Sequence, residues 1–519
     1  MPGGGHLRLS SPAVSSRRAL APLIALAAVA ANPSTAHAYD AEVDAQTIGQ
    51  AYQLRGLTGN PVLSRRRVTQ SLQLGVYNLT DPSREGAPQV LFRARMRIDA
   101  DFGTNRDEYT VSTTSSLDRW IPLLQPAPVE LMYGYLEGKR FAGGWLSFKV
   151  GRQYLVDPLG WYSFDGALFR VTTPAYFAVE AYGGWEVRGG IPLTTNPQIG
   201  RYEMAGIVRA DRSNLPGSAY PSIQPQSLAP VWGAAIETVG PHWIHGRLSY
   251  RKAYNTGASY VAGSGALLGP DQMGIYDRTR TSSERIGYGL NATLAELVGL
   301  RGNLIYDLYG ARFSNVEAGT DLMVHKRVTV SADYTYYRPI FDADSIFNVF
   351  GFEPMDDFTG RLEVDVTDQM NVAADGMVRR YRSDDPDSVL AGSVKVASSL
   401  APGGGLRMRY RWPSARLMLR GNGLAGDQGR RVGADLSYEK TLFNRMFVDG
   451  RISLWDFRDK LRTDGAGGTR DATSIGYVVG AGYKISNESN AMLQWEHDSN
   501  RLVGMRYRIL AMLNVRVWL

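Results

Sequence analysis

Few side chains in this sequence have the types and spacing that catalysis requires. Of the six histidines, four follow residue 38: His242, His245, His325 and His497. Only His497 has acidic neighbours, Glu496 and Asp498, which could orient an imidazole for general acid–base work. A surface histidine between two acids is far more often a solvated loop residue than a catalyst. We therefore expect no catalytic residues and no enzyme.

Metal and cofactor sites have little support either. The sequence lacks cysteine, which excludes disulfides, thiolate metal sites, iron–sulfur clusters and CxxCH haem attachment. Asp384-Asp385-Pro386-Asp387 could offer carboxylates to Ca²⁺, but the rest of a calcium-loop pattern is missing. No helix follows Gly403-Gly404-Gly405, so we interpret it as a turn and not as a phosphate-binding loop. The sequence thus predicts no metal ion and no cofactor.

The regular feature of the chain is an alternation of apolar and polar side chains. In the last segment Val503, Met505, Tyr507, Ile509, Ala511, Leu513, Val515, Val517 and Leu519 alternate with positions that include Arg506, Arg508 and Arg516. Successive side chains of a strand point to opposite faces, so one face is apolar and the other is charged. The segment is about three times as long as a usual soluble strand. This pattern indicates a membrane-spanning strand with lipid outside and water inside.

The same alternation recurs upstream and predicts a charged inner face. Charged residues alternate with apolar ones in two segments, namely Arg93, Arg95, Arg97, Asp99 and Asp101 in the first and Arg361, Glu363 and Asp365 in the second. Equivalent positions are occupied by Lys149 and by Arg407, Arg409 and Arg411. Together with the arginines of the last segment, these side chains are expected to line a lumen. Guanidinium groups stay charged and bind carboxylate or phosphate, so such a path would weakly favour anions. The alternative is that acids on the same wall neutralise the arginines and that the charges have no role in transport.

A membrane wall made of strands must close into a barrel, because an open edge would leave backbone groups unpaired in lipid. No stretch reaches the roughly 18 to 20 apolar residues of a transmembrane helix. Short turns are expected at 81–88, 138–141, 240–241, 294–297, 325–326, 399–403, 441–443 and 486–487, and long loops at 104–126, 187–228, 253–282, 339–356 and 458–472. With both termini in the periplasm and the long loops outside, we expect an antiparallel barrel of about 22 strands, within a range of roughly 20 to 24. This count treats Trp412-Pro413 as a bulge in one long strand and 202–210 as loop.

The strand ends carry two further signals. Aromatic residues that favour membrane–water interfaces lie near them, namely Tyr133, Tyr135, Trp145, Tyr182, Trp185, Trp243, Tyr336, Tyr337, Trp455, Trp495 and Trp518. The apolar face of the last strand continues through Val515 and Val517 to Leu519, and we expect it to be the signal that the barrel-assembly machinery recognises.

The N-terminus has the pattern of a secretory signal peptide. Arg8, Arg17 and Arg18 precede an apolar stretch from Ala19 to Ala31, and Ala36-His37-Ala38 is a small-x-small cleavage site. Sec export with cleavage before Tyr39 would leave residues 39–519 as one barrel domain. Removing the three arginines of residues 1–38 lowers the net charge from +7 to +4, so the high isoelectric point does not indicate nucleic-acid binding.

Residues 146–184 are similar to the middle part of bacterial general porins. The matching residues are Leu146-Ser147-Phe148-Lys149-Val150-Gly151-Arg152-Gln153, Asp165-Gly166, Pro174 and Ala181-Tyr182-Gly183-Gly184. In that family a Gly-Arg-Gln-like strand end leads into a loop folded inside the barrel, so the resemblance implies an in-folded element here. General porins are smaller, 16-stranded barrels with a much longer in-folded loop than Tyr154 to Phe164. Because of this shorter loop, the resemblance does not imply a tight eyelet. The end of the chain departs as well, since outer-membrane barrels commonly end in an aromatic residue and this chain ends in Leu519.

These observations predict a porin-like channel in a Gram-negative outer membrane, through which ions or small hydrophilic solutes diffuse. A TonB-dependent transporter has a large plug domain before its barrel, whereas the alternation here begins by Val68 or even by Asp44. The alternative function is a barrel that sheathes or scaffolds a partner, such as a multihaem cytochrome or another periplasmic or surface protein. Expected partners are outer-membrane lipid and lipopolysaccharide, the barrel-assembly machinery and small hydrophilic solutes. An oligomer is compatible with the sequence, and a nucleic-acid partner is not expected.

Overall fold

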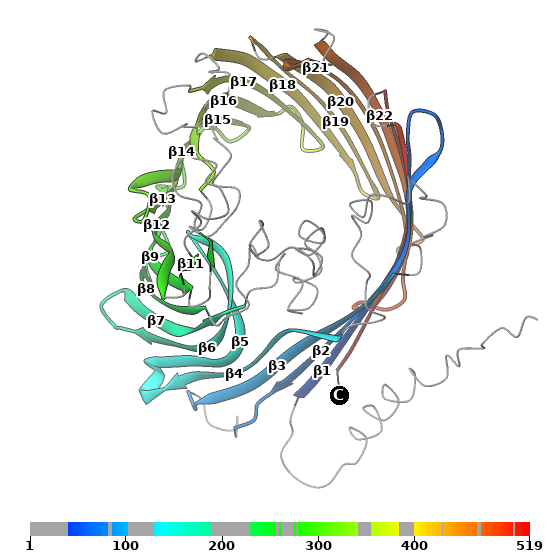
Figure 1. Ribbon diagram of the computed structural model, residues 1–519. Coiled ribbons are helices and arrows are strands. Elements are labelled where there is room, and N and C mark those ends of the chain that lie inside the picture. Colours follow the sequence, from blue (N-terminus) through cyan, green and yellow to red (C-terminus); the bar gives the residue numbers. More distant parts are fainter. Residues whose placement is uncertain are drawn as a thin grey trace, which may run out of the picture.

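The computed structural model describes residues 40–80, 86–101, 129–187, 229–255, 259–260, 275–276, 279–340, 354–382, 399–427, 429–463, 469–501 and 504–518. Within these residues 22 strands form one closed antiparallel sheet, in which neighbours along the chain pair and β24 returns to pair with β1 (Figure 1). The predicted fold class, an all-β barrel of 22 strands, is confirmed. The wall starts at Asp40, which leaves only residues 1–39 of this sequence ahead of it. No helix of the described residues is long and apolar enough to cross a membrane.

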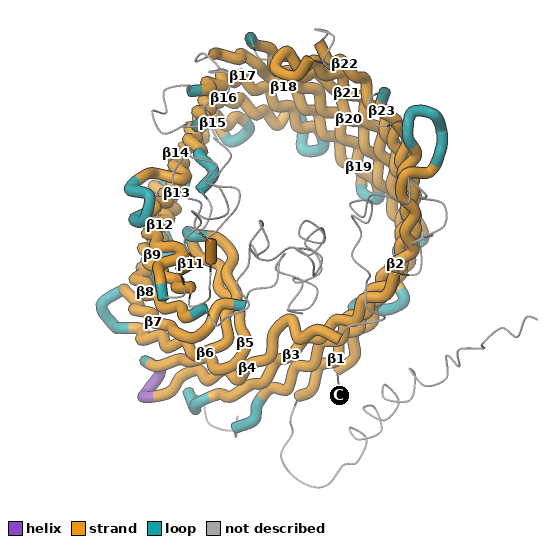
Figure 2. Tube along the Cα trace, viewed as in Figure 1, coloured by secondary structure: helices purple, strands orange, loops and turns teal. Residues whose placement is uncertain are grey.

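The wall is built from long strands joined mostly by short connections. In chain order these are β1 (Asp40–Arg55), β2 (Pro61–Tyr77), β3 (Gln89–Asp101), β4 (Val129–Phe141), β5 (Leu146–Asp157), β6 (Gly160–Thr172), β7 (Phe177–Glu186), β8 (Pro230–Thr238), β9 (Ile244–Asn255), β12 (Arg280–Leu294), β13 (Val298–Asp307), β14 (Arg312–His325), β15 (Val328–Tyr337), β16 (Met355–Asp365), β17 (Met370–Tyr381), β18 (Ser399–Trp412), β19 (Ala415–Gly426), β20 (Gly429–Leu442), β21 (Met446–Thr463), β22 (Thr469–Lys484), β23 (Asn490–Asn500) and β24 (Gly504–Trp518). A short pair, β10 (Ser259–Tyr260) with β11 (Ile275–Tyr276), and a 3-10 turn, η3 (Ala142–Gly144), lie in connections (Figure 2).

The outer face of the wall is a surface of exposed apolar side chains. In β24 the odd-numbered residues Met505, Ile509, Leu513 and Val517 are each at least 40% exposed, as the alternation predicts. Exposed apolar residues occupy alternate positions of the other strands in the same way, for example Phe358 and Leu362 in β16. An apolar surface of this extent is stable only if lipid covers it.

The β5–β6 hairpin identifies the opposite face as the inner one. At its tip the backbone oxygen of Leu159 accepts a hydrogen bond of 3.2 Å from Arg251 of β9. The Leu159 side chain also packs against Gly287 of β12, where a Cβ atom would come within 2.7 Å of it. Because β9 and β12 lie three and four strands away from β6 around the wall, the hairpin must fold into the interior of the barrel to reach them (Figure 1). Directly paired residues point to the same side of a sheet, so the strand register extends this assignment around the barrel.

Two predicted connections are wrong, and their effects on the number of strands cancel. Pro413 and Ser414 form a two-residue turn between β18 and β19 and not a bulge, because proline has no N–H to donate to a strand ladder. The turn expected at 399–403 does not exist, since Ser399 already belongs to β18. Gly403, Gly404 and Gly405 are strand residues as well, and the number of strands is unchanged.

Several strands run further than the apolar alternation indicated. β4 continues to Phe141, so its turn follows at 142–145 instead of 138–141, and β21 and β22 extend into the loop expected at 458–472. Polar residues beyond the membrane still form backbone hydrogen bonds between strands, so the apolar alternation cannot predict where these strands end. The segments 104–126, 202–210 and 384–387 lie outside the described residues.

The aromatic residues divide between the two faces. Trp145, Trp185, Trp243 and Trp495 are between 40% and 51% exposed, as expected for rings at a membrane interface. Trp518 pairs with Glu42 and therefore lies on the inner face. Tyr135 and Tyr182 are buried, and both lie on the inner face with Tyr133 and Trp455. For these five rings the predicted interface position is wrong, because strand ends alone do not tell which face a side chain takes.

Candidate functional site: a charged lumen with an in-folded hairpin

A row of glycines marks the level at which the hairpin leaves the wall. Gly151 of β5 pairs with Gly166 of β6, which pairs in turn with Gly184 of β7. A Cβ atom on Gly166 would lie 2.1 Å from the backbone oxygen of Gly183, so no side chain fits there. Beyond Arg152, toward the hairpin tip, β5 pairs only with β6, because its pairing with β4 ends at Arg152. The backbones approach closely enough to bend the sheet only because these residues lack side chains.

The side of the hairpin that faces the wall is packed as a small apolar core. Leu155, Tyr162 and Phe164 of the hairpin are buried against side chains of β6 to β9, including Leu168, Tyr182, Val231 and Ala253. The Phe164 and Tyr182 rings lie 5.1 Å apart, and Phe164 is fully buried. Arg251 lies 4.1 Å from the centre of the Tyr162 ring and also binds the hairpin tip. The hairpin is therefore a fixed part of the barrel interior.

The other side of the hairpin presents an aromatic surface to the lumen. Tyr154, Val156 and Trp161 are 45%, 69% and 43% exposed on this side. The Tyr154 ring stacks on Trp161 and meets Tyr133 of β4 edge-on, with ring centres 6.3 Å and 5.8 Å apart. Tyr133 in turn donates a hydrogen bond of 2.8 Å to Gln73 of β2. This row extends from the hairpin onto the adjoining wall formed by β4, β3 and β2 and adds to the bulk inside the pore.

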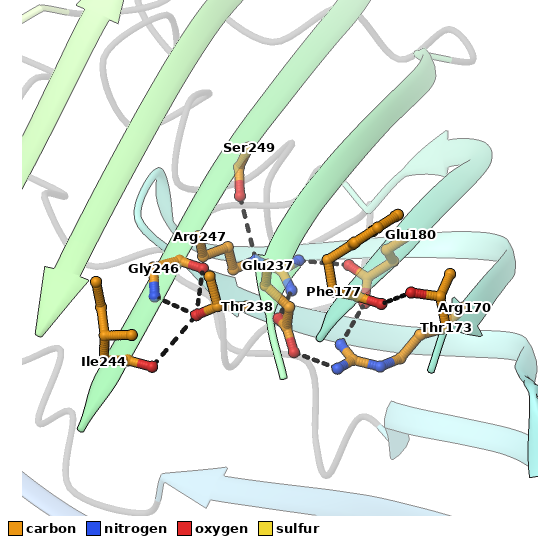
Figure 3. A network of polar contacts seen from close by, with 10 residues as sticks. All are labelled: Arg170, Thr173, Phe177, Glu180, Glu237, Thr238, Ile244, Gly246, Arg247 and Ser249. Atoms are coloured by element: carbon orange, nitrogen blue, oxygen red, sulfur yellow. Dashed lines mark hydrogen bonds and ion pairs between the residues drawn. The ribbon is translucent and has the colours of Figure 1, made fainter. Parts of the chain in front are cut away.

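Charged side chains form closed networks on much of the inner face. Figure 3 shows one, in which Arg170 and Arg247 each contact both Glu180 and Glu237. The Arg247 guanidinium also donates to Ser249 at 3.2 Å. All four charged groups are largely buried and fully paired, which reduces the cost of removing them from water. The network joins β6, β7, β8 and β9 below the hairpin and leaves no free charge.

The arginines of β24 are neutralised by their neighbours. Arg506 and Arg508 both bind Glu496, and Arg506 also binds Asp498. Arg516 lies 3.2 Å from Glu42 and 3.1 Å from Asp44 of β1, across the seam that closes the barrel. For these three predicted lumen residues the alternative of mutually neutralised wall charges describes the contacts.

The arginines of β3 lie among aromatic and amide groups. The Arg93 guanidinium is 5.2 Å from the centre of the Tyr77 ring, Arg95 donates to the Gln46 amide oxygen at 3.3 Å, and Arg97 is buried. Lys149 of β5 lies 3.9 Å from Glu137 and 5.5 Å from the centre of the Tyr135 ring. The side chains of Asp99 and Asp101, together with Ala36, Ala38, Tyr39 and Leu519, are outside the described part of the chain.

The hairpin of β18 and β19 has the largest group of arginines. Arg407 binds Glu363 at 2.8 Å, and Asn371 connects Glu363 to Asp365. Among the described residues Arg361, Arg409 and Arg411 form no ion pair. The structure adds Arg416 and Arg420 of β19, which sequence reasoning missed because it treated 406–419 as one bulged strand. Their alternation with Leu417 and Leu419 was the signal that could have revealed them.

His497 is separated from the two acids beside it. Its ring lies on the outer face between Tyr477 and Tyr507, with ring centres 5.0 Å and 4.5 Å away. Glu496 and Asp498 point to the inner face, where they bind arginines. The described residues bring no His/acid constellation together here, and they contain no group of metal-ligating side chains.

The chain was compared with known proteins in three ways. No family model and no curated protein matches it. Among solved structures it is similar to OccAB3 of Acinetobacter baumannii (10% identity, covering 92% of this chain and 99% of that one, TM-score 0.42). It is also similar to the outer membrane protein opdK of Pseudomonas aeruginosa (8%, 92% and 99%, 0.40) and to OpdQ of the same organism (8%, 93% and 100%, 0.42). Because these identities and TM-scores are low, we assign the class of the protein from the architecture of its own barrel.

That barrel defines the class. A closed antiparallel wall with an apolar outer face and a charged inner face is the architecture of an outer-membrane β-barrel. The chain resembles porin-like outer-membrane channels in this respect, as the local similarity of residues 146–184 predicted.

Proposed function

We propose that the protein is a porin-like channel for passive diffusion of ions or small hydrophilic solutes across a Gram-negative outer membrane. The observation that carries this proposal is the inner face. Apart from the small apolar core beneath the β5–β6 hairpin, it is lined by charged side chains, many of them in ion pairs, so it requires water. The β5–β6 hairpin narrows this water-filled path, and the aromatic row of Tyr133, Tyr154 and Trp161 contributes to the narrowing.

The alternative, a barrel that sheathes or scaffolds a partner such as a multihaem cytochrome, has less support. A sheathed partner needs a wide interior, and here the hairpin occupies part of the lumen beside the wall from β7 to β12. Its packing against Tyr182 and Val231 fixes it there. We therefore favour the channel over the sheath.

The proposal includes a location and a set of partners. Export by the Sec route, cleavage before Tyr39 and insertion by the barrel-assembly machinery would place the barrel in the outer membrane. There the outer face would meet lipid and lipopolysaccharide. No cofactor and no enzymatic activity are part of the proposal.

Planar bilayers provide the test. Purified, folded protein should insert and give stepwise conductance, and the reversal potential in asymmetric KCl should report a slight anion preference that fades as salt rises. A folded barrel that gives no conductance would contradict the channel. Haem absorbance in protein purified from its native membrane would instead support the sheath.

A further inference from the structure

The β18–β19 hairpin carries a large positive charge that its own residues do not balance. Residues 399–426 contain five arginines and neither aspartate nor glutamate. All five, Arg407, Arg409, Arg411, Arg416 and Arg420, lie on the inner face, because the alternate positions hold the exposed Leu406, Trp412 and Leu419. The hairpin is thus a positively charged strip, two strands wide, on the lumen wall.

The strand register brings like charges directly opposite each other. Arg411 pairs with Arg416, and Arg407 pairs with Arg420. Side chains at such positions start about 4.5–5.5 Å apart, and like charges there destabilise a sheet. An acid of a neighbouring strand binds one arginine of each pair, and an anion held by the other arginines would reduce the repulsion that remains.

Acids from neighbouring strands account for only two of the five arginines. Arg407 binds Glu363 at 2.8 Å, and Arg416 binds Glu439 at 2.6 Å. Within the described residues, Arg409, Arg411 and Arg420 form no ion pair. Asp435 lies across from Arg420, but its carboxylate accepts a hydrogen bond from Ser453 and lies 3.6 Å from Arg451. Three permanently charged guanidinium groups are therefore available to a ligand.

We propose that Arg409, Arg411 and Arg420 form a binding site for small divalent oxyanions, with inorganic phosphate or a phosphomonoester as the ligand class. The Cα atoms of Arg409 and Arg411 are roughly 6.5–7 Å apart along β18, and Arg420 lies diagonally across from Arg409 on β19. One anion can therefore contact the guanidinium groups of all three long side chains. A phosphate group carries close to two negative charges and has at least three acceptor oxygens, whereas one carboxylate has only two oxygens and pairs with a single guanidinium group.

The site lies next to the 413–414 turn, at the end of the barrel that holds both termini. With the long loops outside, this is the periplasmic end, and a solute moving inward meets the site last. The proposal deepens the proposed channel function, since it names a solute class. Binding itself does not depend on conductance, and the two can therefore fail separately.

Calorimetric titration of the folded, full-length barrel with inorganic phosphate at low salt tests the site. We expect saturable binding that weakens as KCl rises and is at least about tenfold weaker in the R409Q/R411Q/R420Q variant. The matched control is R430Q, which removes an arginine of the outer face. Glycerol phosphate should compete with phosphate, and acetate at equal concentration should not.

The other outcomes are equally decisive. Absence of phosphate binding, unchanged binding in the triple variant, or equal binding of acetate would each overturn the site. If the triple variant does not fold, R409K/R411K/R420K keeps the charge but loses the fork, and it should bind more weakly than wild type. Phosphate binding by a barrel that conducts no ions would keep the site and reject the channel, and conductance without binding would do the reverse.

Discussion

Two kinds of arginine line the inner face, and only their partners distinguish them. Arg506, Arg508 and Arg516 are held by acids of β23 and β1, so their charge is cancelled locally. Arg409 and Arg411 have no such acids among the described residues. A fixed charge influences a passing ion over about 10 Å at 0.1 M salt, so an unpaired arginine affects selectivity and a paired one hardly does.

Replacing Arg407, Arg409 and Arg411 with glutamine should shift the reversal potential toward cations. The three changes remove three positive charges, and the loss of Arg407 also frees the Glu363 carboxylate that it binds. We expect normal assembly, because the side chains face water. Bilayer recordings in asymmetric KCl measure the shift, and R430Q, which removes an arginine of the outer face, is the control that should leave the reversal potential unchanged. Failure of the triple variant to assemble would show that the assigned face of β18 is wrong.

The sequence could predict the face of each arginine but not its partner. Alternation along one strand places Arg407 on the inner face without reference to any other strand. Its ion pair with Glu363 joins positions 44 residues apart, and it depends on the register of β16, β17 and β18. Nothing local to either residue reports that register. The same reason explains why Glu180 and Glu237, which hold Arg170 and Arg247, were not recognised as a site.

The β5–β6 hairpin is the element that turns a plain barrel into a narrowed one. Its in-folding was implied by the local similarity of residues 146–184, but the structure supplies the cause, a glycine row that lets three backbones approach. The hairpin on the other side of the barrel, β18–β19, was mispredicted at Pro413. A proline fits both a bulge and a tight turn, and only the pairing of Trp412 with Ala415 decides between them.

Substituting Gly166 with valine should destabilise the barrel by about 1–3 kcal/mol or more, because its side chain would overlap the backbone of β7. The midpoint of urea unfolding, followed by tryptophan fluorescence, measures this loss. Gly376→Ala is the matched control, since a Cβ atom there has nothing within 4 Å, and its change should stay within about 0.5 kcal/mol. Equal stability of the two variants would argue against the glycine row.

Shortening the hairpin should widen the pore. Replacing residues 156–161 with Asn-Gly, a favoured two-residue turn, removes the tip that reaches Arg251 and Gly287. We expect a higher single-channel conductance with normal assembly. The same replacement at the 308–311 turn between β13 and β14 is the control and should leave conductance unchanged. A conductance that does not rise would mean that the hairpin is not the narrowest part of the path.

At the scale of the whole molecule, stability depends on closure, because an open sheet edge in lipid leaves a row of backbone groups unpaired. The seam is formed by β1 and β24, whose pairing runs from Glu42 with Trp518 to Arg55 with Met505. Arg516 adds ion pairs to Glu42 and Asp44 across it, and the Trp518 indole donates to Glu488 at 2.8 Å. The first and last strands of the chain therefore depend on each other.

Deleting Val515 to Leu519 should abolish assembly and leave unfolded protein in the periplasm. The deletion removes the last four residues that pair with β1 in the seam, together with the ion pairs of Arg516, and exposes the edge of β1. Two variants separate the length of the seam from its apolar outer face. V515I/V517I keeps both and should assemble normally, whereas V515N/V517N keeps the length but places polar groups toward lipid and should assemble poorly. The folded fraction is measured by the difference in SDS-gel mobility between heated and unheated samples. Normal surface assembly of the deletion variant would show that closure does not need this segment and that the assembly signal lies elsewhere in the chain.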